Sequence, residues 1–278
     1  MNKATTLIVA AVLLLAVAAA VLWYQRRLPE PPPAPPAAAA PEVVPAPTPT
    51  EPAIKHPIEP LAQEQAQKPL PPLEQSDPAV RNALVDWLGR QAVQNFLQTD
   101  DFVRHVVATV DNLGREHASP RLWPVSPMPG RYGVQQAGDA TVVTAGNAER
   151  YAAFITFVEQ LDTKRGVSLY ARNYPLFQRA YEELGYPKRY FNDRLVEVID
   201  LLIATPVPPR LPALRLTEVK GPIPATQPWL RYEFADPQLQ ALPAGQKMLL
   251  RMGPENQRRL QAKLADVRKQ LTAAPPAR

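Results

Sequence analysis

The first 72 residues constrain this chain most, because an uncharged apolar run is followed by a long proline-rich stretch. The run, residues 7–24, consists mainly of Leu, Val, Ala and Ile and ends in Trp23 and Tyr24. As a helix it would extend roughly 27 Å, about the thickness of a thin bilayer core. The two aromatic rings suit the headgroup region, and Arg26 and Arg27 follow as a charged stop. Residues 7–24 are therefore predicted to be a transmembrane anchor in a lipid bilayer.

A cleaved signal peptide is the alternative, since Lys3 gives a short positive segment and Ala18–Ala20 resembles a small-residue cleavage site. The apolar run continues past that site, which favours a retained anchor. Lys3 and the amino terminus balance Arg26 and Arg27, so the positive charges leave the orientation open. In the commoner single-pass arrangement, residues 1–6 lie inside and the large domain lies outside. Since the sequence also lacks cysteine, we expect a bacterial inner-membrane protein with a periplasmic domain.

Residues 25–72 are predicted to be a disordered linker. There are 16 prolines in the 44 residues from Pro29 to Pro72. Proline lacks a backbone donor and fixes φ, so neither a helix nor a sheet can continue through such a segment. The segment also has too little apolar bulk to offset the entropy lost on ordering. It is expected to act as a spacer, with a proline-rich ligand for a partner's aromatic groove as the alternative.

Residues 73–278 are predicted to form a soluble, mainly α-helical domain with a few short strands. Apolar residues repeat at helical spacing, and Asp-Pro, Asn and Gly residues mark helix starts and ends. A short hairpin is predicted around Gly138, and Pro175 is expected to kink or break a long helix. The predicted helices begin near Asp77, Thr99, Asn147, Asp162, Asn192, Asp236, Pro243 and Glu255.

Three carboxylates form a candidate acidic face. Asp193, Glu197 and Asp200 are spaced i, i+4, i+7, which places them on one side of a predicted helix. Converging carboxylates can hold a divalent cation or act as acid and base. The alternative is a solvated face, because the opposite side of this helix is apolar and Arg194 supplies local compensation.

A tyrosine stripe is a second candidate. Tyr170, Tyr174 and Tyr181 repeat at helical spacing, together with Phe177. Aromatic rings with polar tips are typical of glycan and peptide grooves. The alternative is that the stripe belongs to the core, with its hydroxyls reaching the rim.

Basic residues near the C-terminus form a candidate docking face. The whole chain has a net charge of +5, most of it in residues 254–278. Such a helix could dock on anionic lipid or an acidic protein, or it could be an ordinary amphipathic helix with a basic outer face. Nucleic acid is not expected as a partner of an envelope domain. The docking candidates are Arg258, Arg259, Lys263, Arg268 and Lys269.

Apart from the candidate acidic face, no residue pattern in the domain indicates catalysis. His105 and His117 are its only histidines, and with no cysteine and no histidine pair at ligand spacing a zinc site is not expected. The serines lie in no nucleophile-elbow pattern, and no phosphate loop or dinucleotide fingerprint is present. The sequence therefore predicts no catalytic residue, no metal and no cofactor.

Several unusual strings recur in order along the domain. They are ATVDNL (108–113), YPLF (174–177), AYEELGYP (180–187), FNDRL (191–195), FADP (234–237) and AGQKMLLRMGPEN (244–256). Across residues 73–272 the chain thereby resembles the bacterial family catalogued as Domain of Unknown Function 3014. The resemblance implies a proteobacterial membrane protein with an N-terminal anchor, a proline-rich linker and this domain, and it supplies no catalytic residues.

The leading functional hypothesis is a membrane-tethered envelope protein whose helical domain binds or scaffolds another envelope component. The expected partner is an envelope protein. One alternative is a cell-wall or glycan-acting enzyme that uses the acidic face. Another is a glycan-binding module that uses the tyrosine stripe. The sequence leaves the ligand, the pathway and the oligomeric state open.

Overall fold

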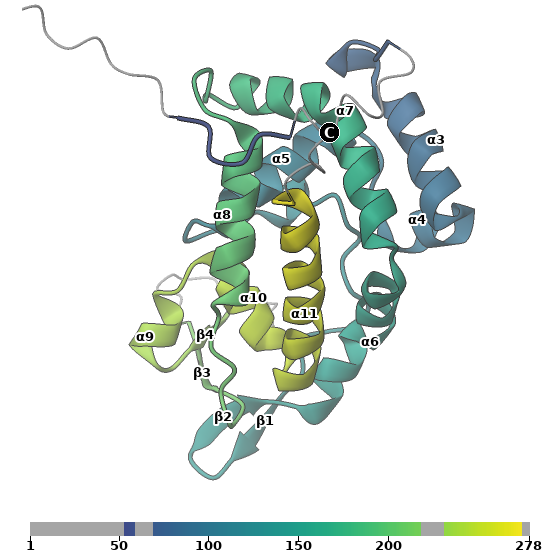
Figure 1. Ribbon diagram of the computed structural model, residues 1–278. Coiled ribbons are helices and arrows are strands. Elements are labelled where there is room, and N and C mark those ends of the chain that lie inside the picture. Colours follow the sequence, from purple (N-terminus) through teal and green to yellow (C-terminus); the bar gives the residue numbers. More distant parts are fainter. Residues whose placement is uncertain (1–52, 59–68, 218–230, 274–278) are drawn as a thin grey trace, which may run out of the picture. The chain divides into compact units, whose positions relative to one another are not determined.

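The structure is a computed structural model that describes residues 53–58, 69–217 and 231–273 (Figure 1). The predicted anchor at residues 7–24 and most of the predicted linker lie outside the described residues. Within the described ranges, no helix combines the length and the apolar character needed to cross a membrane.

The described residues form a mainly helical domain with short antiparallel strands, as the sequence predicts. Long apolar-faced helices supply most of its mass, and short 3-10 turns connect some of them. The elements are η1 (Leu73–Gln75), α3 (Asp77–Leu88), α4 (Arg90–Phe96), α5 (Phe102–Leu113), η2 (Pro120–Leu122), β1 (Val134–Ala137), β2 (Ala140–Val143), α6 (Ala145–Gln160), α7 (Thr163–Glu183), α8 (Phe191–Ile203), β3 (Ala213–Leu216), β4 (Tyr232–Phe234), α9 (Pro237–Gln240), α10 (Ala244–Met252) and α11 (Pro254–Leu271).

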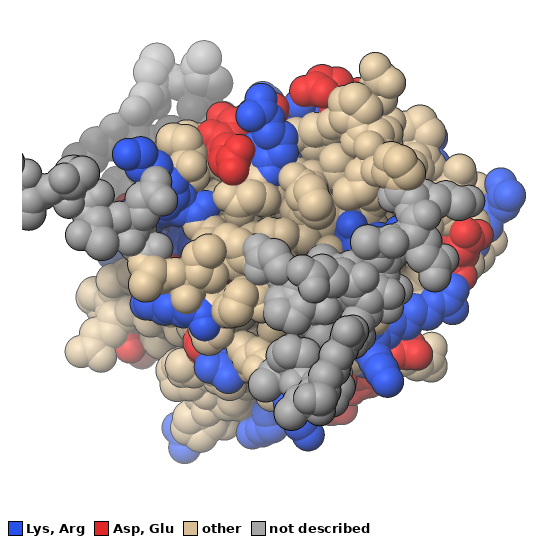
Figure 2. Space-filling view, turned by 45° about the horizontal axis from the view of Figure 1, so that its top comes forward, with Lys and Arg blue, Asp and Glu red and all other residues tan. Residues whose placement is uncertain are grey.

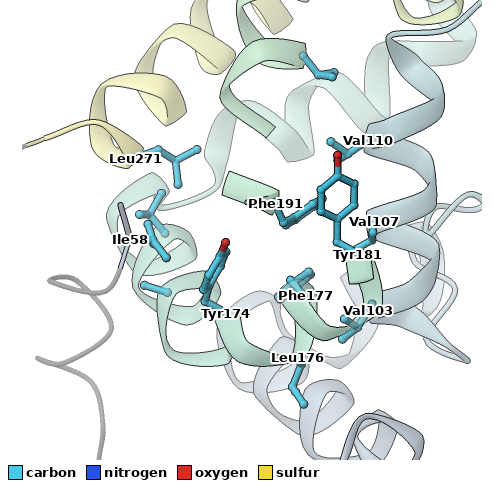
Figure 3. Close-up of a cluster of buried hydrophobic side chains, with 14 of the residues drawn as sticks. Ile58, Val103, Val107, Val110, Tyr174, Leu176, Phe177, Tyr181, Phe191 and Leu271 are labelled. Carbon is cyan, nitrogen blue, oxygen red and sulfur yellow. The ribbon is translucent and has the colours of Figure 1, made fainter. Parts of the chain in front are cut away.

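The main core lies between α5, α7, α8 and α11. Helix α5 packs on α7 and α8, and α11 packs on α6, α7 and α8. Figure 3 shows Val103 and Val107 of α5 directed toward Tyr181 and Phe191. The rings of Phe177 and Phe191 stack with their centroids 6.1 Å apart. Burial of these large apolar side chains is the main source of stability for the helical part.

A smaller cluster lies beneath the sheet. The strands pair antiparallel in the order β1-β2-β3-β4, and Gly138 forms the β1–β2 turn with a φ of 63°, so the predicted hairpin is confirmed. Val143, Leu214 and Phe234 pack against Leu250 of α10. The neighbouring Leu249 belongs to the main core. Helix α10 therefore joins the sheet to the helices.

Helix α7 follows its predicted signals. The side chain of Asp162 accepts the backbone amide of Arg165 at 3.0 Å, which caps the helix. Gly185, with a φ of 111°, follows its end. Pro175 lies inside the helix, and α7 changes direction along its length in Figure 1. The proline therefore bends the helix and does not break it.

Two predicted N-caps are wrong. Helix α6 is capped at Thr144 and α8 at Tyr190, so Asn147 and Asn192 lie within the first turns. Both asparagines are buried, and both use their amides to bridge other segments. Asn147 Nδ2 donates to the Arg251 carbonyl at 3.1 Å. In the sequence, such an asparagine looks the same as a helix cap. In the fold, its side-chain amide is buried and pairs with a backbone carbonyl of a distant segment.

Candidate functional site

A pocket of about 870 Å³ opens between the end of α5, the loop that follows it, α6 and α10. Its size lies in the range of small-molecule sites. Most of its lining is apolar and includes Leu113, Trp123, Phe154 and Met248. Basic residues and phenols from several different elements also line it.

Helix α10 brings Lys247 and Arg251 into the pocket one turn apart. The helix lies deep because Gly245 lets it approach its neighbours closely. A Cβ atom at Gly245 would lie 2.7 Å from Leu202 Cδ2 and 3.1 Å from the Leu113 carbonyl oxygen. Lys247 is consequently buried, and its Nζ donates to the Gln240 carbonyl at 3.2 Å.

Arg150 of α6 also lines the pocket. Its Nε donates to the Pro129 carbonyl at 2.8 Å and one terminal nitrogen donates to the Gly130 carbonyl at 3.2 Å. The other terminal nitrogen donates to Asn147 Oδ1 at 2.8 Å. All of these acceptors are neutral. Arg150 therefore holds the loop in place while its positive charge stays uncompensated by these contacts.

Burial perturbs the ionisable groups of the pocket. It raises the pKa of Tyr132 to about 12, and the nearby Arg251 charge opposes this rise. Burial also raises the pKa of Tyr151, with Arg150 and Arg251 acting in the opposite direction. The pKa of Lys247 is lowered, first by burial and then by Arg251. Perturbed groups that share one pocket are typical of functional sites.

Two buried donors that line the pocket have no partner among the described residues. They are the Tyr132 hydroxyl and the Trp123 indole Nε1. The Arg251 side chain lies close enough to Tyr132 to lower the pKa of that phenol, and one of its terminal nitrogens donates to the Tyr232 carbonyl at 3.4 Å. Buried polar groups are normally paired, since an unpaired one costs about 1–3 kcal/mol. These donors therefore have capacity for a ligand.

The acidic face predicted from the sequence does not converge on this pocket. The Asp193 carboxylate accepts the backbone amides of Lys55 and His56 at 3.0 and 2.7 Å. Glu197 pairs with Arg194 at 2.9 Å and is mostly exposed. Asp200 pairs with Arg268 of α11. None of the three carboxylates lines the pocket, and each has its own partner on a different segment.

Residues 53–58, here called the strap, lie against the start of α8 (Figure 1). The Ile58 side chain is fully buried in the main core. Its amide donates to the Tyr190 hydroxyl at 2.9 Å, and Asn192 Nδ2 donates to the His56 carbonyl at 2.8 Å. Part of the segment interpreted as linker thus packs on the domain, N-terminal to the predicted boundary at residue 73.

The tyrosine stripe belongs mainly to the core. Tyr174 and Tyr181 are 5% and 1% exposed, and both rings point into the cluster shown in Figure 3. Tyr170 is partly buried, and its hydroxyl donates to Asn192 Oδ1 at 3.1 Å. Burial is the main cause of the raised pKa of Tyr174 and Tyr181. The stripe therefore presents no row of open rings to a glycan.

The basic docking candidates divide into two groups. Arg259 pairs with Glu159 at 2.7 Å, Lys263 donates to the Glu159 carbonyl at 3.2 Å, and Arg268 pairs with Asp200. Arg258 and Lys269 are exposed and form no ion pair within the described part of the chain. Figure 2 shows basic and acidic side chains interspersed on the visible face, not gathered into one basic patch.

Sequence reasoning missed the pocket. Lys247 and Arg251 are visible in the sequence at helical spacing, but two cations one turn apart occur on many solvated helices. Tyr132 and Trp123 come from a proline-rich stretch that predicts only turns. Among the described residues, no cluster of three His, Asp or Glu side chains could hold a metal ion.

The model of the family described as a protein of unknown function (DUF3014) matches residues 102–268. The chain therefore belongs to this family, as its sequence strings predict. The match begins at α5 and ends within α11, so it includes every element that lines the pocket. No curated protein and no solved structure matches the chain.

Proposed function

We propose that this chain is a membrane-tethered envelope protein whose helical domain binds another envelope component in the pocket between α5, α6 and α10. The anchor at residues 7–24 and the proline-rich linker support the location. The observation that carries the binding role is the pocket itself, with its apolar lining and the two unpartnered donors of Tyr132 and Trp123.

The remaining features of the domain are less suited to a reaction. An acid–base pair or an activated nucleophile would be expected inside the pocket. Ser119 and Ser126 line it, but among the described residues neither hydroxyl is hydrogen-bonded to a histidine or a carboxylate. Its one lining carboxylate is Glu116, whose side chain is 77% exposed and faces His117. Both side chains are mostly exposed, whereas the Tyr132 hydroxyl is buried. Binding without chemical conversion is therefore the function that this arrangement supports best.

The test is crosslinking in cells that express the full-length protein. A photoreactive amino acid replaces Met248, which lines the pocket, and in a matched strain it replaces the exposed Arg258. The proposal predicts a recurrent adduct from position 248 that is absent from position 258. A bulky substitution at the pocket residue Ala118 should abolish that adduct.

Equal adduct patterns from the two positions would contradict the proposal, and so would no adduct from position 248. The location is tested separately by fractionating the same cells. Recovery of the protein from the soluble fraction in a form that lacks its N-terminal segment would instead establish a cleaved signal peptide.

A further inference from the structure

The charge of the pocket is strongly one-sided. Arg150, Lys247 and Arg251 line it, against the single exposed carboxylate of Glu116. In the part of the chain that the structure describes, none of these three cations forms an ion pair. Their polar contacts are with neutral oxygens, for example the Tyr232 carbonyl, which lies 3.4 Å from an Arg251 terminal nitrogen. Uncompensated cations with partial burial create a strong local attraction for an anion.

The donors that could hold an anion lie together. Arg150, Arg251, Tyr132 and Tyr151 all line the pocket. The Arg150 Cζ atom lies 5.7 Å from the Tyr151 ring centroid. The Tyr132 hydroxyl is unpartnered, and the Arg251 guanidinium stacks 4.9 Å from the Phe234 ring centroid, which fixes its position. An acid group placed beside Tyr132 would accept from this hydroxyl and from a guanidinium, and such charge-assisted bonds are the stronger kind.

The rest of the pocket is unsuited to a purely polar ligand. Leu113, Phe154, Met248 and Leu260 supply its apolar wall, and the pocket occupies about 870 Å³. Inorganic phosphate or a small sugar phosphate would leave most of this wall without contact. A ligand that fills the pocket gains free energy from apolar burial, at about 25 cal/mol for each Å².

We propose that the pocket binds an anionic amphiphile, in which a carboxylate or phosphate group joins an apolar chain. The acid group lies beside Tyr132 between Arg150 and Arg251, and the apolar chain extends along Leu113 and Phe154. This inference rests on the proposed binding function and specifies its ligand class. A free single-chain acid and a membrane phospholipid share this chemistry, and the experiment separates them.

The test uses the full-length protein in nanodiscs of phosphatidylcholine. Palmitate carrying a ¹³C label at its carboxyl carbon is the probe, and dodecyl phosphate, methyl palmitate and inorganic phosphate are the comparison ligands. We expect one palmitate per chain, similar binding of dodecyl phosphate, and at least tenfold weaker binding of methyl palmitate and of inorganic phosphate. Nanodiscs that contain phosphatidic acid should displace palmitate if the bilayer supplies the ligand, whereas continued palmitate binding there assigns a free acid.

Variants locate the acid group. Arg251→Met should weaken palmitate binding at least tenfold, and Tyr132→Phe, which removes only the hydroxyl, should weaken it about threefold to tenfold. Arg258→Gln is the matched control and should leave binding unchanged. If Arg251→Met fails to fold, Met248→Glu places a repelling carboxylate in the pocket and should weaken palmitate without weakening methyl palmitate.

Equal binding of methyl palmitate and palmitate would overturn the proposed recognition of an acid group, while the proposed binding function would remain intact. Binding that is insensitive to all pocket variants would overturn the ligand assignment. If no probe binds while position 248 still gives its specific adduct in cells, the assignment of an anionic amphiphile as the ligand is overturned. The proposed binding function is not.

Discussion

The carboxylate of Asp193 accepts the backbone amide of His56 at 2.7 Å, across 137 residues of sequence. It also accepts the amide of Lys55. Two amides on one carboxylate form a charge-assisted contact that depends on the backbone of the strap and not on its side chains. The strap therefore determines where the segment from the predicted membrane anchor joins the domain, which is at the start of α8.

The first prediction concerns this contact. Asp193→Ala should increase hydrogen–deuterium exchange at residues 55–58 while the helices keep their protection, because it removes the acceptor of two amides. Glu197→Ala, on the same helix, is the control and should leave that exchange unchanged. Ile58→Ala should lower the free energy of unfolding by about 2 kcal/mol. This value is near the lower end for truncation of a buried isoleucine, because the strap can detach from the domain and no enclosed cavity then remains.

Unchanged exchange of the strap in Asp193→Ala would show that the carboxylate does not hold it. A global loss of protection across α5, α7 and α8 would also contradict the prediction, since it would mean that the strap supports the whole core.

The second prediction concerns the depth of α10. Gly245→Ala should lower the free energy of unfolding by about 1–3 kcal/mol, because its Cβ would lie 3.1 Å from the Leu113 backbone carbonyl oxygen, which cannot rotate away. Gly146→Ala in α6 is the matched control. A Cβ there meets nothing within 4 Å, and the change should be neutral or stabilising by up to about 1 kcal/mol.

Denaturant titration of the two variants measures both values. Equal stability of Gly245→Ala and Gly146→Ala would mean that α10 can shift outward at little cost, and the pocket geometry would then not depend on Gly245.

The helices could be predicted from the sequence because local signals agree with the tertiary structure. Asp162 and Asp236 accept amides at the helix starts, and Gly89 and Gly253 separate neighbouring helices with positive φ. Asn147 and Asn192 carry the same kind of signal but serve buried contacts. Single-sequence patterns cannot separate these two uses, because the distinction lies in what the fold places beside each amide.

The pocket could not be predicted for a related reason. Its polar groups come from a loop, α6 and α10. Trp123 and Arg251 are 128 residues apart in sequence, and no local spacing connects them. The predicted acidic face illustrates the opposite case, in which local spacing is visible but tertiary partners are not. Its local spacing is correct, but Asp193 and Asp200 are engaged by the strap and by α11.

The third prediction concerns the predicted docking face. The double variant Arg258→Glu and Lys269→Glu should change the free energy of unfolding by no more than about 0.5 kcal/mol, because both side chains are exposed. Arg268→Glu should lower the free energy of unfolding more than the double variant does, because it replaces an ion pair with Asp200 by two adjacent carboxylates. Only the double variant can therefore test a docking role without also changing the stability of the domain. If the double variant proved less stable than Arg268→Glu, this assignment of the two groups would be wrong.

The last prediction concerns alkaline pH and Tyr132. Its pKa is about 12 in the folded protein, against 10.0 for the ordinary side chain. Between these values the unfolded chain loses the proton while the folded chain keeps it, so the stability contributed by burying the neutral phenol is present below pH 10 and is lost as the pH rises toward 12. Two pKa units correspond to at most about 2–3 kcal/mol.

Tyr132→Phe removes this contribution but leaves the other buried tyrosines in place. The variant should therefore lose less stability than the natural protein between about pH 9 and pH 12, by up to roughly 2 kcal/mol, when denaturant midpoints are compared at each pH. Parallel stability curves for the two proteins would mean that the Tyr132 hydroxyl is solvated in the folded state. The donor that the pocket offers to an acid group would then be satisfied by water, and the ligand contact would have to rest on Arg150 and Arg251 alone.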